Sequence, residues 1–142
     1  MKEEVKSVLQ FNHYIVKKVE FDYNLDCEEN EDGVNIDFDI DADFKVNEDA
    51  TEMVVFLNMV IFDNPIENNY PFKMKLEMAG IFSMKLGEDE DISFYKSNAV
   101  AILFPYARAL VSSYTANSNV TPLVLPTINI NKLLQDKRNR EE

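Results

Sequence analysis

The stretch Val-Asn-Ile-Asp-Phe-Asp-Ile-Asp-Ala-Asp-Phe-Lys-Val, residues 34–46, decides the fold of this chain. Apolar side chains occupy every even position, and polar side chains, among them Asp37, Asp39, Asp41 and Asp43, occupy every odd one. Successive side chains of a β-strand point to opposite faces of its sheet, so this alternation predicts a strand with one apolar and one acidic face. A helix would mix the two sets around its circumference.

Similar patterns lie on both sides of this stretch. Residues 72–86 alternate in the same way, with Gly80 inside the run, which predicts a bulge or a close approach of another part of the backbone. Residues 53–62 are apolar on both faces, which predicts a strand that is central or covered on both sides. Residues 11–23 form a less regular strand pattern. Because turn residues in short connections favour antiparallel pairing of consecutive strands, we expect a four-stranded antiparallel meander.

Beyond the acidic turn that ends at Asp91, the period becomes helical. Apolar spacing from Ser93 to about Ala116 predicts a long helix, which Pro105 should start, kink or interrupt. Residues 121–127 contain two prolines and predict an extended loop, and residues 130–137 predict a short C-terminal helix. The expected fold class is therefore α+β, in a single domain over residues 1–142 without internal repeats.

Composition restricts the partners. The chain has 142 residues with 14 Lys and Arg against 26 Asp and Glu, a formal net charge of −12, which argues against nucleic acid or an anionic membrane as the main partner. The N-terminus has no signal-peptide pattern, and no stretch reaches the roughly 18 apolar residues of a membrane span. We therefore expect a soluble, cytoplasmic protein. The single cysteine, Cys27, can form neither an internal disulfide nor a zinc site.

Catalytic patterns are scarce. His13 is the only histidine and is expected at a surface or edge strand, and the sequence contains no phosphate-binding glycine loop. The aspartates within residues 37–43 are the best metal candidate, but Ala42 stands where a calcium loop requires glycine, so a solvated strand face is expected instead. The sequence therefore predicts no enzyme, no catalytic or metal-binding residue, and no cofactor.

The apolar residues are of an unusual kind. The chain has ten Phe, six Met and six Tyr but no Trp. Flexible methionines and flat aromatic rings suit adaptable apolar surfaces, although they can equally fill a core. Four strands and two helices cannot cover both faces of the expected sheet. Part of this surface should therefore be buried by other subunits or used for binding.

Three ordered segments point to a family. The segment Ala101–Arg108, Ala-Ile-Leu-Phe-Pro-Tyr-Ala-Arg, resembles the most diagnostic motif of the SecB export chaperones. Ala79–Ser83 resembles their Gly-Gly-Ile-Phe turn, and Pro122–Ile130 is similar to their Pro-x-Leu-x-Leu-x-Pro run. With the first strand, the resemblance covers about residue 11 to residue 135.

The resemblance implies an α+β fold and a homotetramer built as a dimer of dimers. It also implies a holdase that binds unfolded or precursor polypeptides through an apolar groove, keeps them from aggregating, and can deliver them to the translocase motor ATPase for export. The alternative is a dedicated chaperone or adaptor on the same fold for one partner, such as an antitoxin, which would not need the motor.

The resemblance and the apolar pattern together suggest site residues. Arg108 is expected to anchor the long helix through a carboxylate. The expected oligomer-interface residues are Met74, Leu76, Met78, Ile102, Phe104, Tyr106 and Leu110. The expected client-binding residues, chosen as exposed apolar positions, are Tyr14, Val16, Val55, Leu57, Leu133 and Leu134.

The motor-docking surface of the family is acidic, and this chain departs from it. Lys73 and Lys75 occupy the matching positions of the fourth strand, and Lys18 stands on the first strand where an acid is expected. Asp22 keeps its sign. These changes argue against delivery to the motor more strongly than against the holding of clients.

Overall fold

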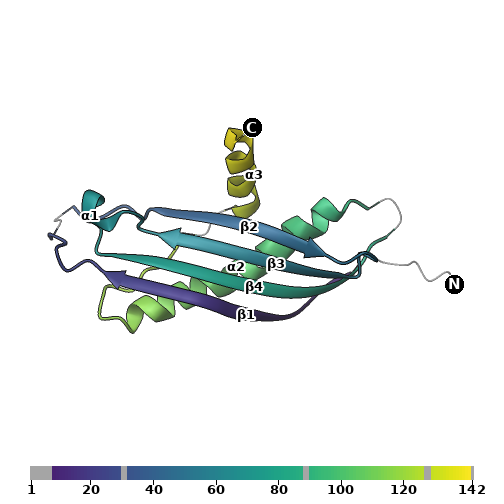
Figure 1. Ribbon diagram of the computed structural model, residues 1–142, viewed down its shortest axis with the longest axis horizontal. Helices are drawn as coiled ribbons and strands as arrows, with labels where there is room; N and C mark the ends of the chain where they lie inside the picture. Colours follow the sequence, from purple (N-terminus) through teal and green to yellow (C-terminus); the bar gives the residue numbers. More distant parts are fainter. Residues whose placement is uncertain (1–7, 30–31, 88–89, 127–128, 142) are drawn as a thin grey trace.

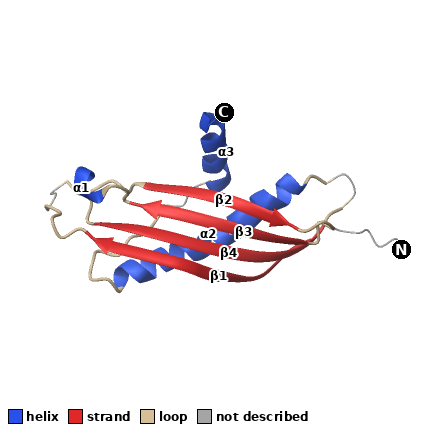
Figure 2. Ribbon diagram, viewed as in Figure 1, coloured by secondary structure: helices blue, strands red, loops and turns tan. Residues whose placement is uncertain are grey.

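The fold is a four-stranded antiparallel sheet with one long helix packed across it. The computed structural model describes residues 8–29, 32–87, 90–126 and 129–141. The elements are β1 (Val8–Tyr23), β2 (Phe38–Val46), β3 (Glu52–Ile61), α1 (Pro65–Asn68), β4 (Phe72–Lys85), α2 (Ile92–Ala116) and α3 (Ile130–Glu141). Helix α2 runs obliquely across one face of the sheet, and α3 projects beyond the β2 edge (Figures 1 and 2). The expected α+β class is confirmed.

The order of the strands differs from the expected meander. It is β1-β4-β3-β2, so β2, β3 and β4 pair in sequence while β1 pairs with β4, from Val8 opposite Lys85 to Tyr23 opposite Phe72. The expectation that β1 neighbours β2 is wrong. Three interstrand spacings of about 4.8 Å separate the two edges of the sheet, and the connection over residues 24–37 is long enough to cross them.

Asn24 holds the start of this connection. Its backbone N–H donates to the Pro71 carbonyl oxygen at 2.9 Å, and its side-chain amide donates to the Tyr70 carbonyl oxygen at 2.9 Å. The chain leaving β1 is thereby fixed to the loop that precedes β4. Strand β2 then begins at Phe38, later than the alternation predicts, and Val34 and Ile36 are 39 % and 37 % exposed in the connection.

The core lies between α2 and the sheet. Leu103, Ala107 and Val111 of α2 are completely buried there. The α2-facing side chains of β3 and β4 are buried as well: Met53, Val55, Leu57, Met59, Ile61, Phe72, Met74, Leu76, Met78, Phe82 and Met84. Strand β3 is central, as expected, but α2 covers only one of its faces (Figure 2).

Gly80 lies under a side chain of α2 and has no room for a side chain of its own. A Cβ atom at this position would lie 3.0 Å from the Phe82 ring and 3.1 Å from a methyl group of Leu103. The sequence predicts a bulge or a close approach of backbone, whereas the atoms that crowd Gly80 belong to side chains. No bulge occurs here, because Tyr14 pairs with Gly80 in register, and the two register shifts of this strand pair fall between Phe11 and His13 and between Val16 and Lys18.

The C-terminal loop is tied along α2, which runs through Pro105 without interruption. The Arg108 guanidinium donates from Nε and Nη2 to the Leu125 carbonyl oxygen at 3.2 and 3.1 Å, so its anchor is a backbone carbonyl and not the expected carboxylate. The Ser112 hydroxyl donates to the Leu123 carbonyl oxygen, and the Leu123 N–H donates to the buried Thr115 hydroxyl. These bonds hold Leu123 and Leu125 against α2.

Candidate functional site

An apolar seam runs where the β1 edge meets α2. The rings of Tyr14 and Tyr106 lie 4.8 Å apart, and Phe11 lies 5.3 Å from Tyr106. Further along, Phe21 lies 5.5 Å from Tyr114. We call these five residues the aromatic seam. Ring pairs at such distances attract each other beyond simple burial, and the rings present a broad apolar surface at one edge of the sheet.

The outward face of α2 continues this surface without charge. Among the 25 residues of α2, only Lys96 and Arg108 are charged. Lys96 lies over the Phe44 ring, and Arg108 is engaged with Leu125. The exposed positions of the helix carry small or apolar side chains and serines: Ser93, Phe94, Ser97, Ala101, Pro105, Tyr106, Ala109, Ser113, Tyr114 and Ala116. A helix face of this kind is typical of a surface that another polypeptide covers.

The expected client-binding residues divide into two groups. Tyr14 and Val16 are 42 % and 41 % exposed on β1, and Tyr14 belongs to the aromatic seam. Leu133 and Leu134 are half-buried on α3. In contrast, Val55 and Leu57 are 0 % and 1 % exposed beneath α2, so the expectation that they are exposed is wrong.

The expected interface residues divide in the same way. Met74, Leu76 and Met78 are at most 2 % exposed on the α2-facing side of β4, so they are core residues of the subunit and unavailable to a second copy. Phe104 is 4 % exposed, whereas Tyr106 is 41 % exposed. Ile102 and Leu110 are half-buried on α2. Alternation shows which side chains share a face but not which face the helix covers, which explains both errors.

The four positions that are expected, from the resemblance, to match a motor-docking surface carry compensated charges. Lys73 pairs with Asp22 in the strand register and forms an ion pair with Asp63 at 3.0 Å. Lys18 forms an ion pair with Glu20 at 2.9 Å. The hydrogen bond between these two side chains raises the pKa of Lys18 and lowers the pKa of Glu20.

Lys75 completes this arrangement, since it stands opposite Glu20 in the register. Its side chain is exposed and alternates along β4 with the buried Met74 and Leu76, which places it on the sheet face away from α2. The face therefore carries side chains of both signs, and not the continuous acidic surface that the resemblance predicts.

A hollow of about 250 Å³ lies between β2, α2 and α3. Its lining residues are Asp41, Ala42, Phe44, Ser93, Lys96, Ser97, Val100, Asn131, Leu134, Gln135, Lys137 and Arg138. We call it the β2 hollow. Helix α3 forms one wall and is fixed at its start by the buried Ile130 and by a hydrogen bond from the Asn131 amide to the Ser97 carbonyl oxygen.

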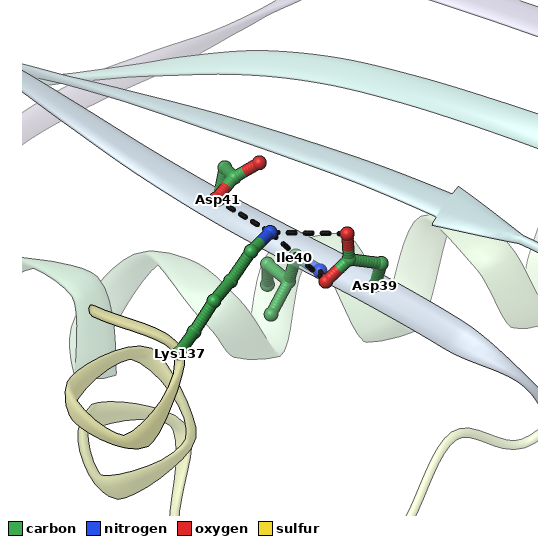
Figure 3. Close-up of polar contacts among 4 residues, drawn as sticks. All are labelled: Asp39, Ile40, Asp41 and Lys137. Atoms are coloured by element: carbon green, nitrogen blue, oxygen red, sulfur yellow. Dashed lines mark hydrogen bonds and ion pairs between the residues drawn. The ribbon is translucent and has the colours of Figure 1, made fainter. Parts of the chain in front are cut away.

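Lys137 fastens the same helix to β2 (Figure 3). Its Nζ lies 2.7 Å from Asp41 Oδ1 and 3.0 Å from both carboxylate oxygens of Asp39. We call these three residues the α3 clasp. The acidic face of β2, expected to be only solvated, therefore holds an ammonium group from the far end of the chain.

The charge of Lys137 is stabilised within the clasp. Partial burial lowers the pKa of Lys137, but the hydrogen bonds and charges of Asp41 and Asp39 together raise it above its usual value. A raised pKa contributes stability that is fully present below the unfolded-state value of about 10.4 and is lost as the pH rises through the folded-state value. Near neutral pH the lysine charge is constant, so added salt is the condition that should weaken the clasp.

Replacing Lys137 with alanine should loosen α3. Ion pairs with exposed carboxylates are individually weak, so we expect amide hydrogen exchange over residues 130–141 to accelerate by a factor of about two to ten. The wild-type rate should approach that of the variant when NaCl rises from about 0.05 to about 1 M, since the Debye length falls to about 3 Å. Lys132→Ala, exposed on the same helix, is the control. Equal acceleration in both variants would show that the clasp does not hold α3.

Sequence reasoning missed the clasp. Asp39 and Asp41 were recognised as neighbours on one strand face, but nothing in the sequence connects them with Lys137, 96 residues beyond Asp41. The hydroxyl of Thr115, which supports the loop before α3, was missed because a buried threonine in a helix leaves no pattern.

The described residues offer little support for other kinds of site. Within the described ranges, no group of three or more His, Cys, Asp or Glu side chains is placed to hold a metal ion. None of the described helices has the length and apolar character required to cross a bilayer. The Cys27 thiol is half-buried and lies 3.6 Å from the Asn69 carbonyl oxygen.

Known proteins resemble this chain over most of its length. The family model described as preprotein translocase subunit SecB matches residues 3–141. An uncharacterised protein of Methanocaldococcus jannaschii is 32 % identical over 132 residues, 92 % of this chain and 84 % of that protein. The protein-export protein SecB of Erythrobacter litoralis is 29 % identical over 105 residues, 73 % of this chain and 57 % of that protein.

A solved structure shares the fold. The SecB-like chaperone of Mycobacterium tuberculosis, determined in complex with a peptide from an antitoxin, superposes with a TM-score of 0.64 at 17 % identity. The superposition covers 84 % of this chain and 87 % of that one. At this level of identity, the superposition shows that the two proteins share a fold.

Proposed function

The chain belongs to the SecB family, and from this premise we propose that it is a holdase chaperone that binds unfolded polypeptides in the cytoplasm. The observation that supports the proposal best is the apolar floor of the β2 hollow, formed by Ala42, Phe44, Val100 and Leu134, at the sheet edge opposite the aromatic seam. Such a surface accepts many apolar sequences because rings and small side chains impose no specific hydrogen bonds. The net charge of −12 opposes the self-association that an apolar surface favours.

The proposal includes assembly into a homotetramer, a dimer of dimers. Both β1 and α2 support it, since β1 is an edge strand and the outward face of α2 is apolar. Exposed strand edges and apolar faces are commonly covered in this way. Tyr106, with Ile102 and Leu110 beside it on α2, would lie between the subunits.

A second candidate function is a dedicated chaperone for one partner. The ion pairs of Lys18 and Lys73 favour it, because they replace the acidic surface through which the family engages the export motor. The structurally similar mycobacterial chaperone holds a peptide from an antitoxin, which is a client of this narrower kind. Such a chaperone would bind its client without docking to the motor.

Aggregation assays distinguish the two candidates. We would follow light scattering by two unrelated unfolding proteins with and without the chain, and determine its molar mass in solution. Suppression of both at about one tetramer per client supports the general holdase. A folded oligomer that suppresses neither contradicts the general holdase, and pull-down of a single partner would then support the dedicated chaperone.

A further inference from the structure

One face of β3 is left open within the subunit. Val54 and Phe56 point to the sheet face away from α2, where both are half-buried and neither belongs to the core. The strand register places Ile81 beside Val54, Ala79 beside Phe56, and Ile15 beside Ala79. We call these five residues the outer band. Figure 2 shows α2 on the opposite face of the sheet, so that helix cannot cover the band.

Polar side chains bound the outer band on both sides. Residues two positions apart on a strand share a face, so the neighbouring rows follow from the same register. These rows contain Lys18, Glu77 and Asn58 on one side, and Gln10, Ser83 and Glu52 on the other. The band is therefore a confined apolar patch of about 10 Å by 7 Å between strand axes, and not part of a generally apolar face.

Strand β2 completes the two rows of the band with opposite charges. Asp43 lies beside Phe56, and Lys45 lies beside Val54. Both charged residues are exposed, and among the described residues neither forms an ion pair. A row that ends in an aspartate thus lies about 7 Å from a row that ends in a lysine. Such a pair of rows is complementary to a copy of itself turned by 180°.

We infer that the outer band is a contact between two copies of this chain, packed sheet against sheet about a two-fold axis. The axis runs across the strands, midway between the two rows. It places Asp43 over the partner's Lys45, and Lys45 over the partner's Asp43, across the roughly 10 Å that separates packed sheets. Phe56 then meets the partner's Val54.

The polar rows fit the same rotation. It sets Glu77 over the partner's Ser83, and Asn58 over the partner's Glu52. Like charges meet at neither position. Since like charges placed opposite each other strongly oppose association, their absence here favours a second copy as the occupant of the band.

The contact should be weak and should strengthen with salt. The band is smaller than the roughly 800 Å² per partner that stable interfaces bury. Each copy also carries a net charge of −12, so two copies repel each other at long range. Salt screens this repulsion, since the Debye length falls to about 10 Å at 0.1 M, while the apolar contact remains.

The pairing goes beyond the proposed function, because it covers neither the aromatic seam nor the β2 hollow. It would instead cover the sheet face on which the resemblance places docking of the export motor. A paired copy would therefore be withdrawn from delivery to a motor but not from the holding of clients.

Sedimentation of the full chain at about 10–500 μM, in about 0.05 and 0.5 M NaCl, tests the inference. We expect the mass to rise from that of the smallest assembly towards a multiple of it, at a concentration about threefold lower in the higher salt. Asp43→Lys sets lysines opposite each other at two places in the contact. It should weaken pairing about tenfold, even though it reduces the net negative charge. Adding Lys45→Asp makes the pairs complementary again and should restore the affinity to within about twofold.

The matched control is Asp49→Lys. Asp49 is exposed in the turn after β2, and its substitution makes the same change in net charge away from the band. Pairing should be unchanged or slightly stronger, because only long-range repulsion is reduced. Equal effects of the Asp43 and Asp49 substitutions, or no recovery in the double variant, overturn the inference. A mass that stays constant at every concentration also overturns it and leaves the band to a different polypeptide. Suppression of aggregation is measured separately, so the proposed function can stand when the pairing fails.

Discussion

Replacing Leu103 with alanine should lower the free energy of unfolding by about 2–5 kcal/mol, one of the two largest effects that we expect. Leu103 is completely buried at the point where α2 meets the sheet, and its methyl groups lie against Gly80. The substitution leaves a cavity that the rigid sheet cannot collapse to fill. Urea unfolding at a fixed protein concentration measures the loss, since assembly makes stability concentration-dependent. Val124→Ala, at a 65 % exposed position, is the control and should change little.

Gly80→Ala makes the same test sharper. In the wild-type background the added methyl group would meet Phe82 and Leu103, both completely buried, so we expect a loss of about 1–3 kcal/mol. In the Leu103→Ala background the methyl group enters the new cavity, and its cost should be smaller or reversed. The double-mutant cycle therefore predicts a favourable coupling between the two substitutions. Additive losses would contradict the packing of Leu103 onto Gly80.

Introducing a charge on the outward face of α2 should have the second large effect, on assembly. Ala109 is exposed and lies one turn after Tyr106 on the same face, so Ala109→Glu should leave the subunit folded. If the proposed tetramer forms through this face, the variant buries an unpaired carboxylate in an apolar interface, which costs several kcal/mol. We expect its molar mass, measured by light scattering after gel filtration, to fall to that of a dimer or a monomer.

The control keeps the charge and changes its place. Asn139→Glu adds the same carboxylate to an exposed position of α3, and the oligomer should remain intact. Circular dichroism must show that both variants are folded. A tetramer that persists in Ala109→Glu would remove the outward face of α2 from the interface and leave it for clients.

Much of the fold could be predicted from periodicity, because a strand that is buried on one side has an apolar residue at every second position of its sequence. The alternation around Ile40 identified β2 and its inward face: Ile40 is 1 % exposed, whereas Asp39 and Asp41 point to the α3 clasp. Strand order could not be predicted in the same way, since the pattern of β1 is the same whether it pairs with β2 or with β4. The place of Asn24 against the β3–β4 loop is a long-range contact without a local signal.

The candidate site is harder to predict from the sequence than the fold. From the sequence, Tyr14 is expected to contact clients and Tyr106 to lie in an interface, and the structure brings their rings together. The sequence does not reveal that Val55 and Leu57, expected to be exposed, are covered by α2. Which side chains are exposed depends on which elements pack together. The pattern along the sequence shows only which residues of one strand or helix share a face.

The strand order also determines which strands can pair while the chain is being synthesised. β1 is synthesised first, but among the described strands it pairs with β4 alone, so its pairing cannot begin until Phe72 has left the ribosome and is complete only after Lys85. The β2–β3 hairpin can close earlier, because both of its strands precede β4 in the sequence. During synthesis, the chain therefore carries an unpaired strand rich in aromatic and β-branched residues, and for that interval it has the same exposure to aggregation as a nascent chaperone client.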